Sequence, residues 1–173
     1  MLFGNFVDKF GGMVYDGGRK EGDKMNDHAM IAEKLFKEGY NCAQSVLLAF
    51  SDVTGLDDKT AAMLASSFGG GIGRMREVCG AVSGGAMVLG LVRGYADPAD
   101  REAKKAHYAS VRGFADRFRE ANGSIVCREL LQGVGAGEGG DPEARTPAYY
   151  RKRPCAQLVK TAAEILDGML FAD

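Results

Sequence analysis

The sequence predicts an all-α protein, folded as a compact single domain of about six to seven helices. Apolar residues recur at spacings of three and four through most of the chain, which is the period of a helix with one buried face. The sequence lacks the period-two alternation that marks a half-buried strand. A length of 173 residues is sufficient for one domain whose core needs no disulfide bonds.

The first 24 residues are predicted to form a leader, followed by a helical four-cysteine domain over 25–173. Within the leader, residues 2–15 carry an apolar stripe at helical spacing, and residues 15–26 have the composition of a linker. A frayed leader and a helix that docks on a second subunit are both compatible with this pattern, because chain termini are ordered only where contacts hold them.

Three helices are expected before the glycine-rich part of the chain. The first is predicted over 28–38, and the second begins after Asn41. Because asparagine is among the best N-cap residues, Asn41 should accept hydrogen bonds from the first turn, and this places Cys42 in that turn. The third helix is predicted to start at Asp57 or Asp58.

Residues 69–92 are the stretch around which the other helices are expected to pack. A glycine-rich loop leads through Cys79 into a helix without charged side chains, and a helix that is apolar all round belongs in the middle of a fold. Its uncharged run, Val78 to Val92, is shorter than the ~18 residues of a membrane span, so no membrane span is predicted. Each internal glycine costs about 1 kcal/mol relative to alanine, so close packing or a bound group must offset this cost.

The longest predicted helix covers 98–121. Pro98 stands where the first helical residue is expected, since proline lacks the amide that would go unpaired there. After this helix, Ser124 is expected to cap a further one with Cys127 as its third residue. The buried stripe of the long helix is predicted to be Ala103, His107, Val111, Phe114 and Phe118.

Residues 133–153 have the composition of a surface loop, with several glycines and few apolar side chains. Its basic run over 151–153 is expected to be solvated, although its closeness to Cys155 allows a role in guiding an acidic partner. The last helix follows, with Pro154 as its first residue and Cys155 directly after it.

The charge balance excludes some classes of partner. The chain has 22 basic and 23 acidic residues and a formal net charge of −1, so nucleic acid is not expected as a partner. The first residues lack the basic and apolar regions of a secretory signal, and we expect a cytoplasmic location. That compartment keeps thiols reduced, so the four cysteines are not expected to form structural disulfides.

The four cysteines have the spacing C-x36-C-x47-C-x27-C, which contains no CxxC pair and disfavours a thioredoxin-type dithiol or a local zinc knuckle. They stand near predicted helix starts, where the partial positive charge lowers the pKa of a thiol. For Cys79 no N-cap residue is evident, and the glycine loop before it could supply amide donors instead. Four thiolates in one place require compensating cations, so iron or zinc is the expected partner of a shared site.

Glycines add a second feature to this predicted site. An iron–sulfur cluster needs N–H donors close to its sulfides, and glycine permits that close approach. A phosphate-binding loop is a weaker interpretation of GGGIG, because the lysine and hydroxyl of a Walker motif are missing. The residues expected to surround the cofactor are Asn41, Gly70, Gly71, Gly73 and Gly80.

Four sequence features resemble one known family: YNCAQSVLLAF around Cys42, GGGIGR, CGAVSGG from Cys79, and the single cysteines Cys127 and Cys155. Together they are similar to the C_GCAxxG_C_C family of redox-active proteins, from Met25 to roughly the end of the last helix. Related segments also look like the non-haem part of split-Soret cytochromes. The resemblance assigns the family's four cysteines to these positions and implies a metal-cluster role.

The leading hypothesis is a small electron-transfer protein that binds an iron–sulfur cluster through Cys42, Cys79, Cys127 and Cys155. One alternative is a pair of cysteines that cycles between dithiol and disulfide. Another is a helical interaction domain with a zinc site, or with buried free cysteines and no cofactor. A redox partner protein is expected, and the apolar leader is compatible with a homodimer; the sequence indicates no substrate.

Overall fold

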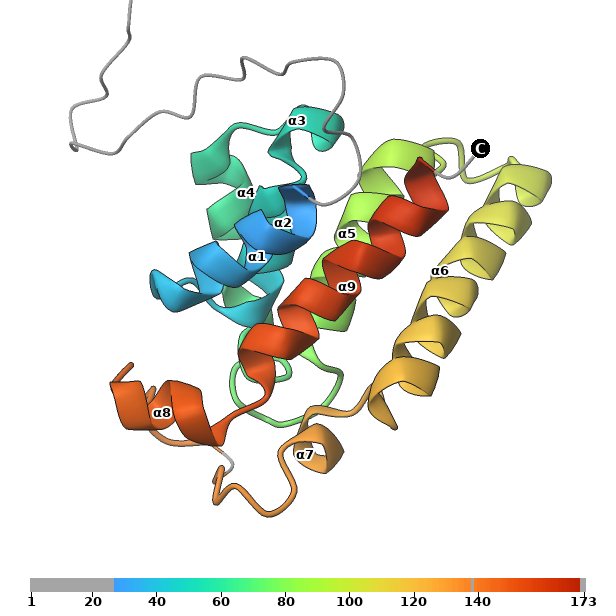
Figure 1. Cartoon of the computed structure of the whole chain (residues 1–173). Helices are drawn as coiled ribbons and strands as arrows, with labels where there is room; N and C mark the ends of the chain where they lie inside the picture. The colour runs from blue at the N-terminus through green and yellow to red at the C-terminus, as the bar shows by residue number, and fades with distance from the viewer. Residues whose placement is uncertain (1–26, 138, 172–173) are drawn as a thin grey trace, which may run out of the picture.

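Nine α-helices and one turn of 3-10 helix make up the secondary structure of the computed structural model, which describes residues 27–137 and 139–171 (Figure 1). These residues contain no strand, so the all-α single domain is confirmed, with nine helices rather than six or seven. The predicted leader over 1–24 lies outside the described residues. The elements are α1 (Asp27–Lys37), α2 (Cys42–Ala49), α3 (Ser51–Thr54), α4 (Asp58–Ala65), the 3-10 turn (Ser66–Phe68), α5 (Gly80–Arg93), α6 (Arg101–Asn122), α7 (Cys127–Leu130), α8 (Pro147–Lys152) and α9 (Cys155–Leu170).

The helices α2, α5 and α9 pack against one another in the interior of the fold. α1 covers α9 and α2, α4 lies on α2, and α6 packs along α5 and α9. Fully buried aromatic rings come from α1, from the end of α2 and from α6; they are Phe36, Phe50, Phe114 and Phe118. Burying such a ring contributes about 1.5–3 kcal/mol, so these four side chains hold α1 and α6 on the interior helices.

Glycine allows α5 to approach two neighbouring helices closely. A Cβ atom at Gly84 would lie 2.7 Å from a carbonyl oxygen of α2, and one at Gly85 would lie 2.3 Å from the ring of Phe114 in α6. Both distances are shorter than a real side chain could accept, so the close packing expected of this helix is present. The expectation of burial all round is wrong for its last turn, where Leu91 and Val92 are 44% and 36% exposed.

The start of α6 differs from the prediction. The helix begins after Asp100 and not at Pro98. The Asp100 carboxylate accepts a hydrogen bond from the Ala103 amide at 2.8 Å, and this side-chain cap determines where the helix begins.

The start of α7 also differs, because Cys127 is its first residue and not its third. The Ser124 hydroxyl oxygen accepts a hydrogen bond from the Val126 amide at 2.9 Å, before the helix begins. Ser124 therefore forms a side-chain turn that leads into α7 instead of capping it.

A short helix occupies part of the segment over 133–153 that was predicted to be a loop. The Thr146 side chain accepts a hydrogen bond from the Tyr149 amide at 3.2 Å and starts α8 there, a cap that the prediction missed. Pro154 is the N-cap residue of α9 and not, as was predicted, its first residue. The helix therefore begins one residue later, at Cys155.

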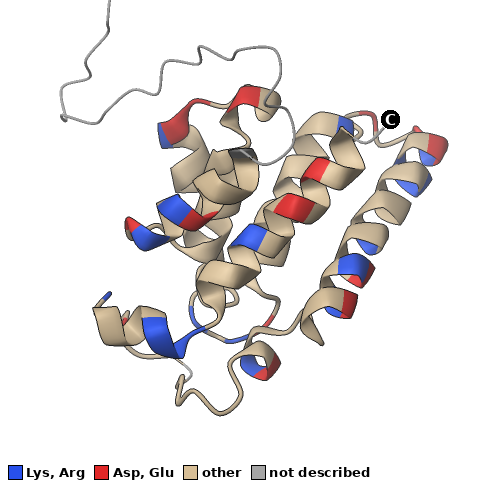
Figure 2. Cartoon of the chain, viewed as in Figure 1, with Lys and Arg blue, Asp and Glu red and all other residues tan. Residues whose placement is uncertain are grey.

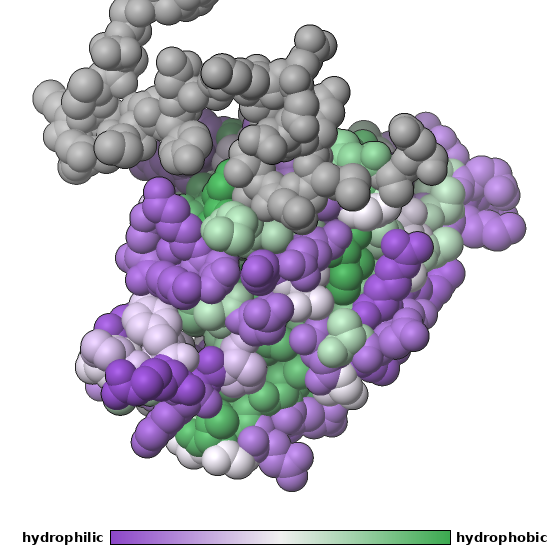
Figure 3. Space-filling model, in the orientation of Figure 1, coloured by the Kyte–Doolittle hydropathy of each residue, from purple (hydrophilic) through white to green (hydrophobic). Residues whose placement is uncertain are grey.

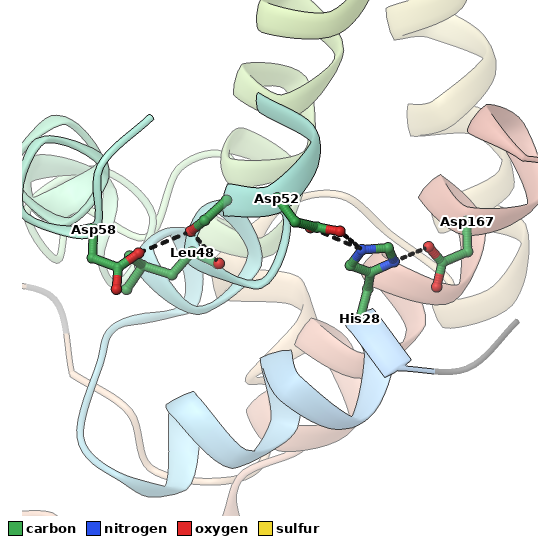
Figure 4. A network of polar contacts seen from close by, with 6 residues as sticks. His28, Leu48, Asp52, Asp58 and Asp167 are labelled. Atoms are coloured by element: carbon green, nitrogen blue, oxygen red, sulfur yellow. Dashed lines mark hydrogen bonds and ion pairs between the residues drawn. The ribbon is translucent and has the colours of Figure 1, made fainter. Parts of the chain in front are cut away.

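A buried histidine joins three helices (Figure 4). His28 lies in the first turn of α1, as predicted, and its ring stands between the carboxylates of Asp52 in α3 and Asp167 in α9. The ring also stacks on Phe50, with centroids 4.2 Å apart. This side chain therefore connects the first and last helices of the described chain.

The surface is mixed in character. Basic and acidic residues are both distributed over the helices (Figure 2), and hydrophilic residues cover much of the face in Figure 3, with hydrophobic residues showing between them. Within the described ranges, no helix combines the length and the apolar character needed to cross a membrane.

Candidate functional site

The four cysteines line one cavity of about 40 Å³, at the end of the fold that carries α7 and α8 in Figure 1. Cys42, Cys127 and Cys155 are the first residues of α2, α7 and α9, and Cys79 is the N-cap residue of α5. All four are free thiols; three are buried and Cys42 is half-buried. The predicted placement of every cysteine at a helix start is therefore confirmed.

Asn41 sets the position of Cys42. Its side-chain oxygen accepts hydrogen bonds from the amides of Ala43 and Gln44, at 2.9 and 3.0 Å. The Gln44 side chain in turn accepts from the Asn41 amide at 2.9 Å, which completes a capping box. Asn41 also donates to the Ser66 carbonyl at 3.0 Å and lines the cavity, so the predicted cap is confirmed and also belongs to the site.

A short antiparallel pairing holds Cys79 beside Cys127. An isolated β-bridge joins the residues that precede these two cysteines. The Cys79 amide donates to the carbonyl of Ile125 at 2.8 Å, and the Cys127 amide donates to the carbonyl of Glu77 at 2.7 Å. Because backbone groups pair on both sides, the two cysteines are fixed relative to each other by the main chain.

The glycine-rich loop before Cys79 is a left-handed turn, and its residue Gly70 lines the cavity. A β-branched residue at positive φ is an outlier, so Ile72 keeps this conformation only because the surrounding contacts hold it. The amides of residues 72–77 donate to carbonyls of residues 67–72. These amides are therefore used within the loop, and they are not the donors to the site that the sequence analysis considered. The positive φ angles are 64° at Gly70, 70° at Gly71, 57° at Ile72, 53° at Gly73, 68° at Arg74 and 58° at Arg76.

Two of the predicted glycines bring backbone close to the thiols. A Cβ atom at Gly71 would lie 2.7 Å from the Cβ of Cys127, and one at Gly80 would lie 3.0 Å from the Cβ of Cys42. Gly80 also lines the cavity. Gly73 does not line it, and a Cβ there would meet open space. A side chain at Gly71 or Gly80 would therefore displace a cysteine, whereas one at Gly73 would not.

Arginine side chains line the cavity together with the thiols. Arg76 is only 2% exposed; its Nη1 lies 4.0 Å from the sulfur of Cys127, and its Nε donates to the Gly137 carbonyl at 2.9 Å. Arg145 and Arg153 are the other two arginines that line the cavity. No Asp or Glu of the described chain lines the cavity, so the charged groups that face the thiols are all positive.

Arg145 and Arg153 reach the cavity from either side of α8. The Arg145 guanidinium lies 4.6 Å from the ring centroid of Phe36 and 4.9 Å from that of Tyr149. Arg153 stacks on the same tyrosine at 4.7 Å and forms an ion pair with Glu143. Such stacking over aromatic rings holds a guanidinium in place. Because Arg153 is only 8% exposed, the prediction of a solvated basic run is wrong for this residue.

Burial raises the pKa of two of the thiols. It raises the pKa of Cys79 to about 12, against the opposing effect of hydrogen bonds from the amides of Ala81 and Val82. Burial also raises the pKa of Cys127, where the guanidinium of Arg76 acts in the other direction. The expected lowering at a helix start is wrong for Cys127, because removing a thiolate from water outweighs it.

Cys42 and Cys155 share a hydrogen bond that moves their pKa values in opposite directions. The Cys42 thiol donates to the Cys155 sulfur, and this bond lowers the pKa of Cys155 despite burial, with help from the charges of Arg153 and Arg145. The same bond, followed by burial and repulsion from the other cysteines, raises the pKa of Cys42 well above its ordinary value. Cys155 alone follows the predicted lowering and is the most readily deprotonated thiol.

The donor set suits a thiolate-bound metal centre. Four sulfur ligands are the set that holds iron–sulfur clusters and many zinc ions, and here they belong to one cavity. In the residues that the structure describes, however, no group of three or more His, Cys, Asp or Glu side chains is arranged to hold a single metal ion. The residues therefore match such a centre in chemistry and location, while their sulfurs are not set around one ion.

The sequence did not indicate Arg76, Arg145 or Tyr149 as site residues. They belong to no motif with a recognisable spacing, and Arg145 and Tyr149 do not stand close to a cysteine in the sequence. The available signals were the positions of Arg76, three residues before Cys79, and of Arg153, two residues before Cys155. The positive lining of the cavity follows from the tertiary structure alone.

No curated protein and no solved structure matches the chain. The comparison with protein families matches residues 40–169 to the family described as "Putative redox-active protein (C_GCAxxG_C_C)". This match covers most of the chain and includes all four cysteines, so the resemblance noted from the sequence is confirmed. The chain belongs to this redox-active protein family.

Proposed function

We propose that this protein transfers electrons through an iron–sulfur cluster held by Cys42, Cys79, Cys127 and Cys155. The observation that carries the proposal is the meeting of four thiols, from four helix starts far apart in the sequence, at one cavity. When bound, such a cluster supplies one-electron transfer. With all four cysteines as ligands, no protein position is left for a substrate, which favours electron transfer over catalysis.

The charges around the cavity support a thiolate-bound centre. Three of the four thiols have raised pKa values, so they stay protonated at neutral pH unless a cation replaces the proton. The arginines that line the cavity offset part of the negative charge that four thiolates bring. Three of the four cysteines are buried, which limits the contact of their thiols with bulk water.

Anaerobic purification followed by assays of iron and acid-labile sulfide tests the proposal. We expect iron and sulfide in the native protein, and their loss when any one cysteine is changed to serine. Ser83→Ala, in the first turn of α5 beside Cys79, is the matched control and should retain both. Colourless protein that takes up no iron during reconstitution would contradict the proposal.

A second candidate function is thiol–disulfide exchange by Cys42 and Cys155, and the hydrogen bond between these thiols favours it. The Cys155 thiolate would attack a disulfide of a partner protein, releasing one partner thiolate and forming a mixed disulfide. The Cys42 thiol would then lose its proton and attack Cys155, giving the intramolecular disulfide and the second partner thiol. Alkylation and mass spectrometry at defined redox potentials distinguish the two functions, because a cycling pair gains or loses two thiols together.

Either function requires a redox partner protein that supplies or accepts electrons. A homodimer stays a prediction, and sedimentation of the full chain tests it.

A further inference from the structure

Two guanidinium groups at the thiol cavity carry buried nitrogen atoms without hydrogen-bond partners. In the described part of the chain, Nη2 of Arg76 and Nη1 of Arg145 are buried and unpaired. Further nitrogens of the two groups are engaged: Arg76 Nε donates to the Gly137 carbonyl, Arg76 Nη1 lies 4.0 Å from the Cys127 sulfur, and Arg145 Nη2 donates to the Tyr40 carbonyl at 3.3 Å. Each guanidinium is thus held in place by contacts of its own and keeps one buried nitrogen without a hydrogen-bond partner.

Unused buried donors of this kind are unfavourable unless something binds them. A buried polar group without a partner is destabilising in protein interiors, and an unpaired charge is more so. No carboxylate of the described residues lines the cavity, and Glu143, which pairs with Arg153, lies outside the lining. An anion would be a suitable partner for both guanidiniums.

We propose that Arg76 and Arg145 form an anion-binding subsite in the thiol cavity, and that its ligand is a small inorganic anion. The cavity volume of about 40 Å³ sets the size, because each water-sized group needs roughly 10–15 Å³. There is room for about three such groups, which suits a three-atom anion and excludes a nucleotide or a sugar phosphate.

This inference goes beyond the proposed cluster, because it concerns the anion that the arginines bind and requires no iron. The negative charge could come from a free inorganic anion or from the sulfide and thiolate atoms of a bound cluster. Both sources present the same chemistry to the guanidiniums. Metal-free protein separates them, since only the free anion is then available.

Calorimetric titration of thiocyanate into full-length, reduced, metal-free protein at constant ionic strength tests the subsite. Thiocyanate is a linear anion of three heavy atoms. We expect saturable binding at one site per chain, weakened about tenfold or more in Arg76→Met and in Arg145→Met, since each variant loses charged donors. Arg151→Met removes an exposed arginine that does not line the cavity, so it is the matched control and should bind as the native protein does.

Adenosine monophosphate tests the size argument, because it is also an anion but is much too large for the cavity and should not bind. Absence of saturable thiocyanate binding, or equal weakening in Arg151→Met, would overturn the subsite. If Arg76→Met loses its helical circular dichroism, Arg145→Met decides the question. Iron assays on the same preparations separate the two proposals: iron uptake without thiocyanate binding defeats only the subsite, and thiocyanate binding without iron uptake defeats only the cluster.

Discussion

His28 Nδ1 lies 2.5 Å from Asp167 Oδ1, and this contact joins the first turn of α1 to the last part of α9. The same ring approaches Asp52 of α3 at 3.2 Å through its other nitrogen (Figure 4). Asp167 stands twelve positions after Cys155 on α9, which corresponds to roughly 18 Å along the helix. Changes at His28 should therefore affect stability without reaching the thiol cavity.

The contact between His28 and Asp167 predicts a pH-dependent stability. Burial by itself would lower the pKa of His28, but the hydrogen bond and charge of Asp167, with a smaller effect of Asp52, raise it above its ordinary value of 6.5. A raised folded pKa stabilises the fold fully below the unfolded pKa, and this stabilisation is lost as the pH rises through the folded pKa. We expect Asp167→Asn to lower the free energy of unfolding by about 1.5–3 kcal/mol near pH 6.

Urea denaturation of Asp167→Asn and the native protein, between roughly pH 6 and 9, measures this effect, and the difference should shrink as the pH rises. Glu164→Gln removes an exposed carboxylate from the same helix and should show a small difference that does not depend on pH. A difference for Asp167→Asn that stays constant over this range would show that the charge on His28 contributes nothing.

The four thiols should differ in their reactivity with iodoacetamide. Alkylation proceeds through the thiolate, the pKa of Cys155 is lowered, and burial raises the pKa of Cys79 to about 12. In reduced, metal-free protein at neutral pH we expect Cys155 to react first and Cys79 last, as read by peptide mass spectrometry. Cys42→Ala removes the hydrogen bond to Cys155 and should slow alkylation of Cys155. Faster reaction at Cys79 than at Cys155 would contradict the assignment.

Two glycines of α5 form a matched pair for testing helix packing. A Cβ atom at Gly85 would lie 2.3 Å from the ring of Phe114, whereas one at Gly90 would meet nothing within 4 Å. We expect Gly85→Ala to lower the free energy of unfolding by about 1–3 kcal/mol through overpacking. Gly90→Ala should raise it by up to about 1 kcal/mol, because alanine favours the helix. Urea denaturation measures both, and equal effects would show that α5 and α6 are not in close contact.

Local interactions explain which parts of the site could be predicted from the sequence. The Asn41 cap depends on residues within one turn, so asparagine before an apolar run was enough to place Cys42 at a helix start. Where two local signals competed, the prediction chose wrongly, as at α6, where Asp100 caps the helix and Pro98 lies outside it. The rule that proline favours the first turn says nothing about a stronger cap two residues later.

Features that depend on distant segments could not be predicted. The sequence placed the cysteines at helix starts but gave no measure of burial, and burial decides the pKa values of Cys79 and Cys127. Arg76 and Arg145 come from separate loops and meet only through the tertiary fold. The positive charge of the cavity limits what the site can bind. It could therefore not be predicted from sequence motifs.

Gly71 and Gly73 provide the final prediction, which concerns the site itself. Both have positive φ angles, so alanine at either position should cost about 1–2 kcal/mol in backbone strain. Only at Gly71 would the new Cβ also meet the Cβ of Cys127, at 2.7 Å. We expect Gly71→Ala to reduce iron content after reconstitution strongly and Gly73→Ala to retain it, with urea denaturation confirming that both variants fold. Equal iron content in the two variants would mean that the close approach of this loop to Cys127 is not needed to form the centre.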